Sequence, residues 1–266
     1  MIYLLLFIIS LIGGFFSGFL GIGGAVVISP LILLLPPLFG LGEVTMKTIA
    51  GLSMMQVFFG SLSGTIIHRK NKFVHNKIFL YLGIPLALSA LFGSYTSKFL
   101  PNISLMIMLD FFVMLSFIMM LYMLKLKDHV MEDTDKAINK PFAIIMGIMT
   151  GFISGMIGAG GGIIMIPLFL SVFKLKVKVA IGTSLAIVFL GSIFGAIGKL
   201  MSFQVDFLLA IPIVAGSLIT AQLGAKINKK SKSGVIKYFL IAVLILSFLQ
   251  VTYKIFSNYL GLSEQR

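Results

Sequence analysis

Residues 14–31 read GFFSGFLGIGGAVVISPL, and residues 151–168 read GFISGMIGAGGGIIMIPL. We call these two stretches the first and the second glycine cassette. They align without a gap at an offset of 137, and nine of their eighteen positions are identical. Each lies in a long uncharged stretch, because residues 1–42 and 141–173 contain no Asp, Glu, Lys or Arg. A duplicated helix-breaking motif in apolar surroundings indicates a transporter built from two repeats, with its site where helices are interrupted near the bilayer midplane.

The composition is that of a membrane protein. Of the 266 residues, 59% are hydrophobic and 11% are charged, whereas soluble domains carry about 25% charged residues. Apolar runs near twenty residues recur along the chain, which predicts an all-α polytopic membrane protein. The net charge of +13 does not indicate nucleic-acid binding, since no basic face is interleaved with aromatic residues. The absence of cysteine excludes disulfides and thiolate sites, and three scattered histidines give no reason to expect a metal or another cofactor.

Five apolar segments are expected in each half of the chain. They are 2–20, 22–38, 46–67, 78–97 and 102–124, then 141–157, 159–173, 179–200, 207–225 and 235–257. As one helix, 141–173 would be about 50 Å long, whereas the hydrocarbon core is about 30 Å thick, so each cassette must break its helix. A re-entrant hairpin and two closely packed full spans both satisfy this requirement. The predicted organisation is a first repeat at 1–125, a charged cytoplasmic linker at 126–140 and a second repeat at 141–266.

The basic residues predict the orientation. Sixteen of the 21 lie in four loops: Arg69, Lys70, Lys72, Lys77; Lys125, Lys127, Lys136, Lys140; Lys174, Lys176, Lys178; and Lys226, Lys229, Lys230, Lys232, Lys237. The positive-inside rule places these loops in the cytoplasm, and they share that side only if each cassette forms a there-and-back hairpin. The other five, Lys47, Lys98, Lys199, Lys254 and Arg266, then lie at the outer face of the cytoplasmic membrane, together with both termini. The two halves become inverted-topology repeats, each a broken-helix hairpin plus three transmembrane helices.

The glycines of the cassettes are candidate substrate-binding residues. They are Gly21, Gly23 and Gly24 with Ala25 in the first cassette, and Gly158, Gly160, Gly161 and Gly162 in the second. Glycine accepts positive φ and permits close approach of a ligand. A helix that starts after such a turn directs unpaired N–H groups and a positive dipole end at the gap, which suits an anion. The alternative is packing, because Gly14 and Gly18, like Gly151 and Gly155, have the small-xxx-small spacing of close helix contacts.

A second repeated element supports the duplication. Gly51, Ser53, Gly60, Ser61 and Gly64 recur at an offset of 131 as Gly182, Ser184, Gly191, Ser192 and Gly195. The polar side chains of Ser53, Gln56, Thr183 and Ser184 are predicted to line the site. The alternative is that these hydroxyl groups bond their own i−4 carbonyl or a neighbouring helix.

One acid, Asp110, lies well inside a predicted span. Acids within membrane spans are candidates for proton relays, so Asp110 is a candidate for proton coupling. Glu43 lies about 20 residues after the first cassette, as the ribose-binding acid of a dinucleotide site does. We reject that interpretation because no βαβ unit fits and the second cassette has Lys178 at the comparable distance.

These motifs resemble the TauE/SafE family of membrane transporters, which are described as sulfite exporters. The paired pattern G-x-x-G-x-GG(G)-x5-P-L matches residues 18–31 and 155–168, and the element 182–185 also looks like that family. The resemblance covers essentially the whole chain and implies transport of sulfur-containing anions such as sulfite or sulfonates. Ala25 replaces the third glycine of the first cassette, and Leu52 stands where Thr183 stands in the second half. The first cassette is therefore expected to be the less suited to a ligand.

The expected function is a secondary transporter of a small anion that works by alternating access. A passive anion channel and a non-transporting receptor or partner subunit are the alternatives. No GxxxxGK[ST] motif indicates nucleotide hydrolysis, and an enzyme would need a nucleophile with a base, a metal cluster or paired acids within the spans. The expected partners are the small anionic substrate and the lipid bilayer; a coupling proton or other ion and a homodimer are left open.

Overall fold

The computed structural model describes residues 1–70, 73–125 and 139–259, and these residues form helices and connecting loops without a strand. Residues 126–138 of the expected charged linker lie outside the described residues. The elements of the first half are α1 (Ile2–Leu20), α2 (Ala25–Leu38), α3 (Met46–Lys70), α4 (Asn76–Ile78), a π-helical turn (Phe79–Gly83), α5 (Ile84–Thr96), a 3-10 turn (Ser97–Phe99) and α6 (Asn102–Lys125). Those of the second half are α7 (Lys140–Ile157), α8 (Gly162–Ser171), α9 (Val177–Met201), α10 (Phe207–Lys230) and α11 (Ser233–Tyr259). The prediction of an all-α polytopic membrane protein is confirmed, with eight helices in the described residues long and apolar enough to cross a membrane.

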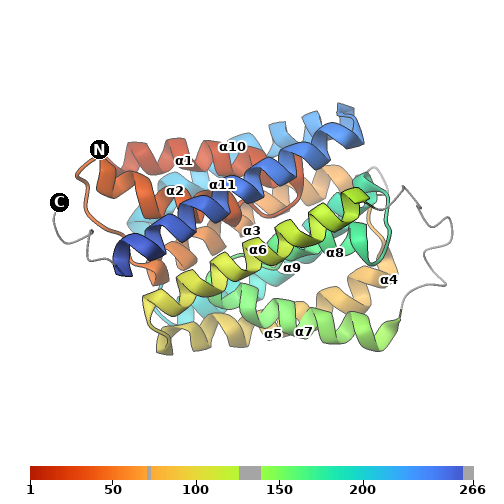
Figure 1. The fold of residues 1–266 in the computed structure, drawn as a ribbon, viewed down its shortest axis with the longest axis horizontal. Helices are drawn as coiled ribbons and strands as arrows, with labels where there is room; N and C mark the ends of the chain where they lie inside the picture. Colours follow the sequence, from red (N-terminus) through yellow and green to blue (C-terminus); the bar gives the residue numbers. More distant parts are fainter. Residues whose placement is uncertain (71–72, 126–138, 260–266) are drawn as a thin grey trace.

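Each glycine cassette joins one long helix to one short helix. α1 has 19 residues and α7 has 18, whereas α2 has 14 and α8 has 10. At 1.5 Å per residue, α8 is about 15 Å long and cannot cross a core of about 30 Å. In Figure 1, α1 runs from the N-terminal end of the molecule toward its middle, and α2 returns toward that end. The structure therefore has hairpins at the cassettes and not pairs of full spans.

The long helices α3 and α9 form the centre of the bundle and are the most buried of the candidate spans. Around them, α1 packs on α10 and α7 packs on α5. The short helix α2 packs on α11, and the short helix α8 packs on α6. In all four of these pairings, the partners come from opposite halves. The halves therefore interlock and do not form separate bodies.

Glycines let the outer helices touch backbone to backbone. A Cβ atom on Gly18 of α1 would collide with the carbonyl group of Ala221 on α10, and one on Gly155 of α7 would collide with that of Ala90 on α5. Gly14 and Gly151 make equivalent contacts one turn earlier. These contacts confirm the packing role that the small-xxx-small spacing predicts for these four glycines.

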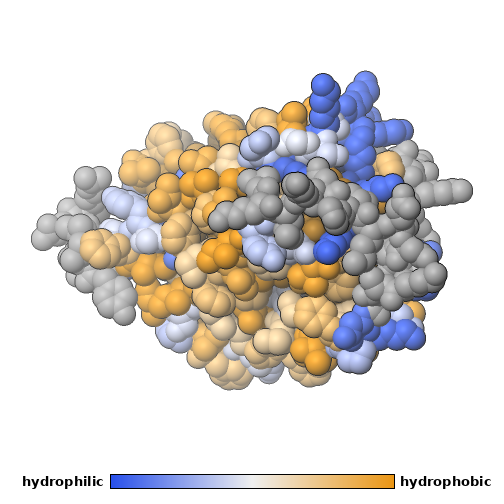
Figure 2. All heavy atoms as spheres, turned by 45° about the vertical axis from the view of Figure 1, so that its right-hand side comes forward, coloured by the Kyte–Doolittle hydropathy of each residue, from blue (hydrophilic) through white to orange (hydrophobic). Residues whose placement is uncertain are grey.

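The surface has an apolar belt and one basic end. Large apolar side chains such as Phe92, Ile118 and Leu246 are exposed on the outer helices, and orange covers much of the surface in Figure 2. Lys176, which precedes α9, and Lys230, which ends α10, are exposed. In Figure 1, the connections from α8 to α9 and from α10 to α11 lie at the end of the molecule opposite the N-terminus. Figure 2 shows hydrophilic residues gathered toward this end. The described basic loops thus lie together, as the there-and-back hairpins require.

Candidate functional site

The two cassettes break their helices through left-handed glycines. Gly21 ends α1 with a φ of 77° and donates its N–H to the Ser17 carbonyl, and Gly24 begins α2 with a φ of 81°. Gly158 ends α7 at 79°, and Gly161 begins α8 at 93°. Side chains with a Cβ atom rarely adopt these angles. The repeated glycines are therefore required by the turn itself.

The two turns meet in the buried centre, between α3 and α9. A Cβ atom on Gly162 would collide with the carbonyl group of Ile22, so the start of α8 lies against the first turn. Gly23 and Gly160 both face the side chains of Val57 on α3 and Val188 on α9; the position of a Cβ atom on Gly23 is 3.1 Å from a methyl carbon of each valine. The cassette residues that the sequence predicts for the site are thus brought together.

The starts of the two short helices carry unpaired backbone donors. Within the described residues, no hydrogen bond uses the N–H groups of Gly23, Gly24, Ala25 and Val26 at α2, or of Gly160, Gly161 and Ile163 at α8. Ala25 is fully buried, so its N–H group is also removed from solvent. Two helix N-termini with free donors meeting in an apolar core form an electropositive centre built from backbone alone.

The predicted hydroxyl groups are occupied by protein partners. Ser184 on α9 donates to the Gly21 carbonyl at 2.8 Å, and Ser53 on α3 pairs with Ser29 on α2 at 3.0 Å. Thr183 accepts from the N–H of His75 at 2.9 Å, in the connection between α3 and α4. Ser53 and Ser184 therefore hold the hairpins in place in this conformation, and Thr183 faces a loop and not the cassettes.

Gln56 on α3 differs from these hydroxyls. Its side chain is fully buried, and neither atom of its carboxamide has a hydrogen-bond partner among the described residues. The carboxamide lies directly against Gly24, the residue that begins α2; a Cβ atom there would be 2.7 Å from Oε1. The hydroxyl of Ser17 on α1, also fully buried and unpaired, lies close by. A buried polar group without a partner costs free energy, so this pair requires an explanation.

Two serines that sequence reasoning missed compensate for the cassette prolines. Pro30 in α2 has no N–H to give to the carbonyl of Val26, four residues earlier, and the Ser247 hydroxyl on α11 donates to that carbonyl at 2.7 Å. In the second half, Pro167 leaves the Ile163 carbonyl unpaired, and Ser116 on α6 donates to it at 3.0 Å. Each serine comes from the half opposite to the proline it compensates. A proline in an apolar helix signals the need for a donor, but it does not reveal which residue supplies it.

Polar side chains also bond carbonyl groups at the ends of α1 and α7, the helices that precede the cassettes. Asn228 on α10 donates to the Phe19 carbonyl in the last turn of α1 at 2.6 Å. In the second half, Lys199 on α9 donates to the Met156 carbonyl in the last turn of α7 at 2.8 Å.

Lys199 is buried, which its position in the sequence does not indicate. It lies at the end of the expected segment 179–200, in the last turn of α9, and its side chain is fully buried. Its ammonium group donates to Met156 and also to the Ser97 hydroxyl at 2.8 Å and the Gln204 carboxamide oxygen at 2.7 Å. Three acceptors use its three donors, and its charge sits at the negative end of the α7 dipole.

Asp110 lies away from the cassettes. Its carboxylate accepts from the Thr252 hydroxyl on α11 at 3.1 and 3.2 Å, at the contact between α6 and α11. The side chain is partly exposed. The contact joins one helix of each half, and a proton-coupling role for Asp110 stays a prediction.

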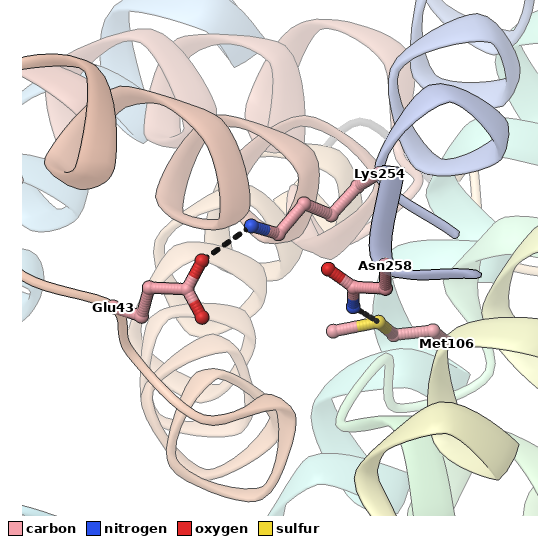
Figure 3. Close-up of polar contacts among 4 residues, drawn as sticks. All are labelled: Glu43, Met106, Lys254 and Asn258. Carbon is pink, nitrogen blue, oxygen red and sulfur yellow. Dashed lines mark hydrogen bonds and ion pairs between the residues drawn. The ribbon is translucent and has the colours of Figure 1, made fainter. Parts of the chain in front are cut away.

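Glu43 takes part in an ion pair at the end where α11 finishes. Its Oε1 lies 2.6 Å from Nζ of Lys254 on α11, and Figure 3 shows the two side chains pointing toward each other. Beside them, the Asn258 carboxamide contacts the Met106 sulfur at 3.9 Å. These contacts tie the loop after α2, and α6, to the last turns of α11.

The described residues contain no group of three or more His, Cys, Asp or Glu side chains that could hold a metal ion.

Comparisons with known proteins agree with this architecture. The model of the family described as sulfite exporter TauE/SafE matches residues 6–251. The probable membrane transporter protein YunE of Bacillus subtilis (strain 168) is 31% identical over 271 residues, which cover 96% of this chain and 98% of YunE. A probable membrane transporter protein of Methanocaldococcus jannaschii is 32% identical over 242 residues, covering 85% of this chain and 86% of the relative. No solved structure matches the chain.

Proposed function

Because this chain belongs to the sulfite exporter TauE/SafE family, we propose that it is a secondary transporter that moves a small anion across the cytoplasmic membrane. The proposed substrate is a sulfur-containing oxyanion or an organosulfonate. Family membership and eight apolar helices make it a multi-pass membrane protein; the substrate and the mechanism are our proposal.

The observation that carries the proposal is the meeting of two helix N-termini at the buried centre. Free N–H groups at the starts of α2 and α8 supply donors without a fixed positive charge. Discontinuous helices of this kind are how many secondary transporters bind the anionic groups of their substrates. The uncharged stretches 1–42 and 141–173 supply no acid that would repel the substrate.

Alternating access is supported by the exchange of contacts between the halves. In the order of the chain, α1, α2, α5 and α6 of the first half correspond to α7, α8, α10 and α11 of the second. Replacing each helix by its counterpart therefore converts the α1–α10 contact into the α7–α5 contact, and the α2–α11 contact into the α8–α6 contact. A two-fold relation between the halves requires this exchange. We propose that the axis lies in the membrane plane, so that the repeats are inverted, with the basic loops in the cytoplasm and both termini outside.

Transport assays with purified protein in proteoliposomes test the function. We expect saturable uptake of methanesulfonate or sulfite, accelerated by unlabelled substrate on the opposite side, as a carrier requires. Flux that stays linear with substrate and shows no acceleration would identify a channel. Absence of flux for sulfite, sulfate, thiosulfate and methanesulfonate would exclude sulfur oxyanion transport and favour a partner subunit.

Coupling to protons has its own test. If Asp110 carries the coupling proton, an imposed pH gradient drives accumulation in the wild-type protein and not in Asp110→Asn, while exchange without a gradient continues in both. Equal accumulation in the two proteins would remove Asp110 from the mechanism.

A further inference from the structure

Both cassettes have unpaired backbone N–H groups, and in the described residues the first cassette also has unpaired buried side chains beside its turn. Ser17 and Gln56 contribute a hydroxyl and a carboxamide, both fully buried and both without a partner in the described residues. Both groups lie beside Gly60 of α3, because a Cβ atom on this glycine would be 2.9 Å from Oγ of Ser17 and 3.3 Å from Nε2 of Gln56. The carboxamide also lies against Gly24, whose N–H is one of the unpaired donors at the start of α2. We call Ser17, Gly24, Gln56 and Gly60 the Gln56 cluster.

The corresponding place in the second half is apolar. Ile187 stands at the position equivalent to Gln56, with the offset of 131 that relates α3 to α9. The Leu86 side chain of α5 lies between Gly161 and Gly191, which correspond to Gly24 and Gly60: Cβ atoms on them would lie 2.8 and 2.5 Å from its methyl carbons. The serine equivalent to Ser17 is Ser154, whose hydroxyl bonds the Gly151 carbonyl at 3.2 Å. An anion at the second cassette would therefore contact the Leu86 side chain, whereas an anion at the first cassette would contact the Gln56 carboxamide.

We propose that the substrate binds at the first cassette alone, in the Gln56 cluster, and that it is a singly charged oxyanion. This inference rests on the proposed transport of small anions and specifies where the anion sits. The Gln56 NH2 group, the Ser17 hydroxyl and the N–H groups at the start of α2 are its donors. The sequence favours the second cassette because of its third glycine, whereas the unpaired side chains of Ser17 and Gln56 favour the first.

The charge of the substrate follows from the absence of cations around the cluster. The cluster is formed by α1, α2 and the buried part of α3. These elements lie within residues 1–42 and 48–67, which contain no charged side chain. Lys199, the buried lysine of α9, donates instead to Met156, Ser97 and Gln204. The cost of desolvating an ion rises with the square of its charge in the Born treatment, and neutral donors must offset all of it. A dianion such as sulfate is disfavoured, whereas an alkanesulfonate or hydrogen sulfite is accommodated. The Gln56 oxygen, an acceptor, suits an anion that retains a proton.

Gln56→Met is the sharpest variant because it preserves length and removes both polar atoms. A group that is unpaired in the protein does not stabilise the fold, so this variant keeps the melting temperature of the wild-type protein or exceeds it. We expect its affinity for methanesulfonate to fall at least tenfold. The matched control is Ile187→Met at the equivalent position of α9, whose affinity stays within twofold of the wild type. Ser17→Ala, which deletes only the unpaired hydroxyl, should lose affinity several-fold.

Calorimetric titration of the purified proteins with methanesulfonate, sulfite and sulfate separates the outcomes. Binding of methanesulfonate that is lost in Gln56→Met and retained in Ile187→Met supports the site. Wild-type affinity in Gln56→Met, or in Ser17→Ala should the methionine variant not fold, overturns the site and leaves the proposed transport standing. Sulfate binding as tight as methanesulfonate overturns the charge assignment. A wild-type protein that binds none of the three overturns the proposed function, and the inference with it.

Discussion

Replacing Ser247 by alanine should destabilise the protein in a way that depends on Pro30. The Ser247 hydroxyl is the partner of the Val26 carbonyl at 2.7 Å, and both residues are buried. An unsatisfied buried carbonyl costs about 1–3 kcal/mol, and interhelical hydrogen bonds in membranes average about 0.6 kcal/mol with a maximum of about 1.7. We therefore expect Ser247→Ala to lower the free energy of unfolding by about 1–2 kcal/mol, a factor of roughly 5–30 in the unfolding equilibrium.

The dependence on Pro30 arises because alanine at that position restores the missing N–H. In the Pro30→Ala background, the helix supplies its own donor to the Val26 carbonyl. The cost of Ser247→Ala should then fall by about 1 kcal/mol, since the carbonyl is no longer left unpaired. The four proteins form a double-mutant cycle, measured by reversible unfolding in mixed detergent micelles. Equal costs of Ser247→Ala in both backgrounds would refute the compensation argument.

Other predictions follow from the same contacts. Gly18→Leu should prevent correct folding, seen as loss of a monodisperse peak in size-exclusion chromatography, because α1 and α10 touch there. Ser184→Ala should lower stability by about 1 kcal/mol in the same unfolding assay, since the Gly21 carbonyl loses its donor. Glu43→Gln should cost at most about 1 kcal/mol, with the difference from wild type vanishing at high salt, because the glutamate is largely exposed. In this cysteine-free chain, Glu43→Cys should react with an impermeant thiol reagent added to intact cells and Lys176→Cys should not; the opposite pattern would invert the proposed orientation.

The helices could be predicted from the sequence because local chemistry decides them. The expected segments 46–67, 102–124 and 141–157 correspond to α3, α6 and α7 within a few residues. The breaks in the helices at the cassettes were predictable for the same reason, since positive φ there demands glycine whatever packs around them. The choice between hairpin and full spans needed the structure, because an apolar run does not reveal where a ten-residue helix such as α8 ends.

The hydrogen-bond partners could not be predicted because packing between distant segments decides them. Ser53 and Gln56 lie on the same helix, and the sequence predicts the same role in the site for both. Only their neighbours in the structure show that Ser53 is hydrogen-bonded and Gln56 is not. Lys199 lies at the end of the expected segment 179–200, where a lysine is ordinarily exposed, and the sequence does not indicate that it is buried. In the structure, Ser97, Gln204 and Met156 converge on it from three elements, and their oxygens make its burial possible. Lone polar residues near the ends of apolar segments are therefore poor guides to topology.

The bonds across the halves bear on how such a protein could move. Ser247 of the second half holds α2 of the first, and Ser116 of the first half holds α8 of the second. Each short helix is thereby fixed to a long helix from the opposite repeat. The contacts of α1 with α10 and of α7 with α5 combine close glycine packing with hydroxyl bonds, because Ser10 on α1 donates to the Ile213 carbonyl and Ser94 on α5 donates to the Gly155 carbonyl. The halves of the sequence and the groups of helices that pack together are therefore different divisions of this fold. Movement between α1–α10 and α2–α11 would bend the chain at the positive-φ glycines of the first cassette, where the Gln56 cluster lies. The first cassette is one of two connections between these pairs, the other being residues 231–232 between α10 and α11, so a substrate placed at that turn would connect its binding directly to the movement.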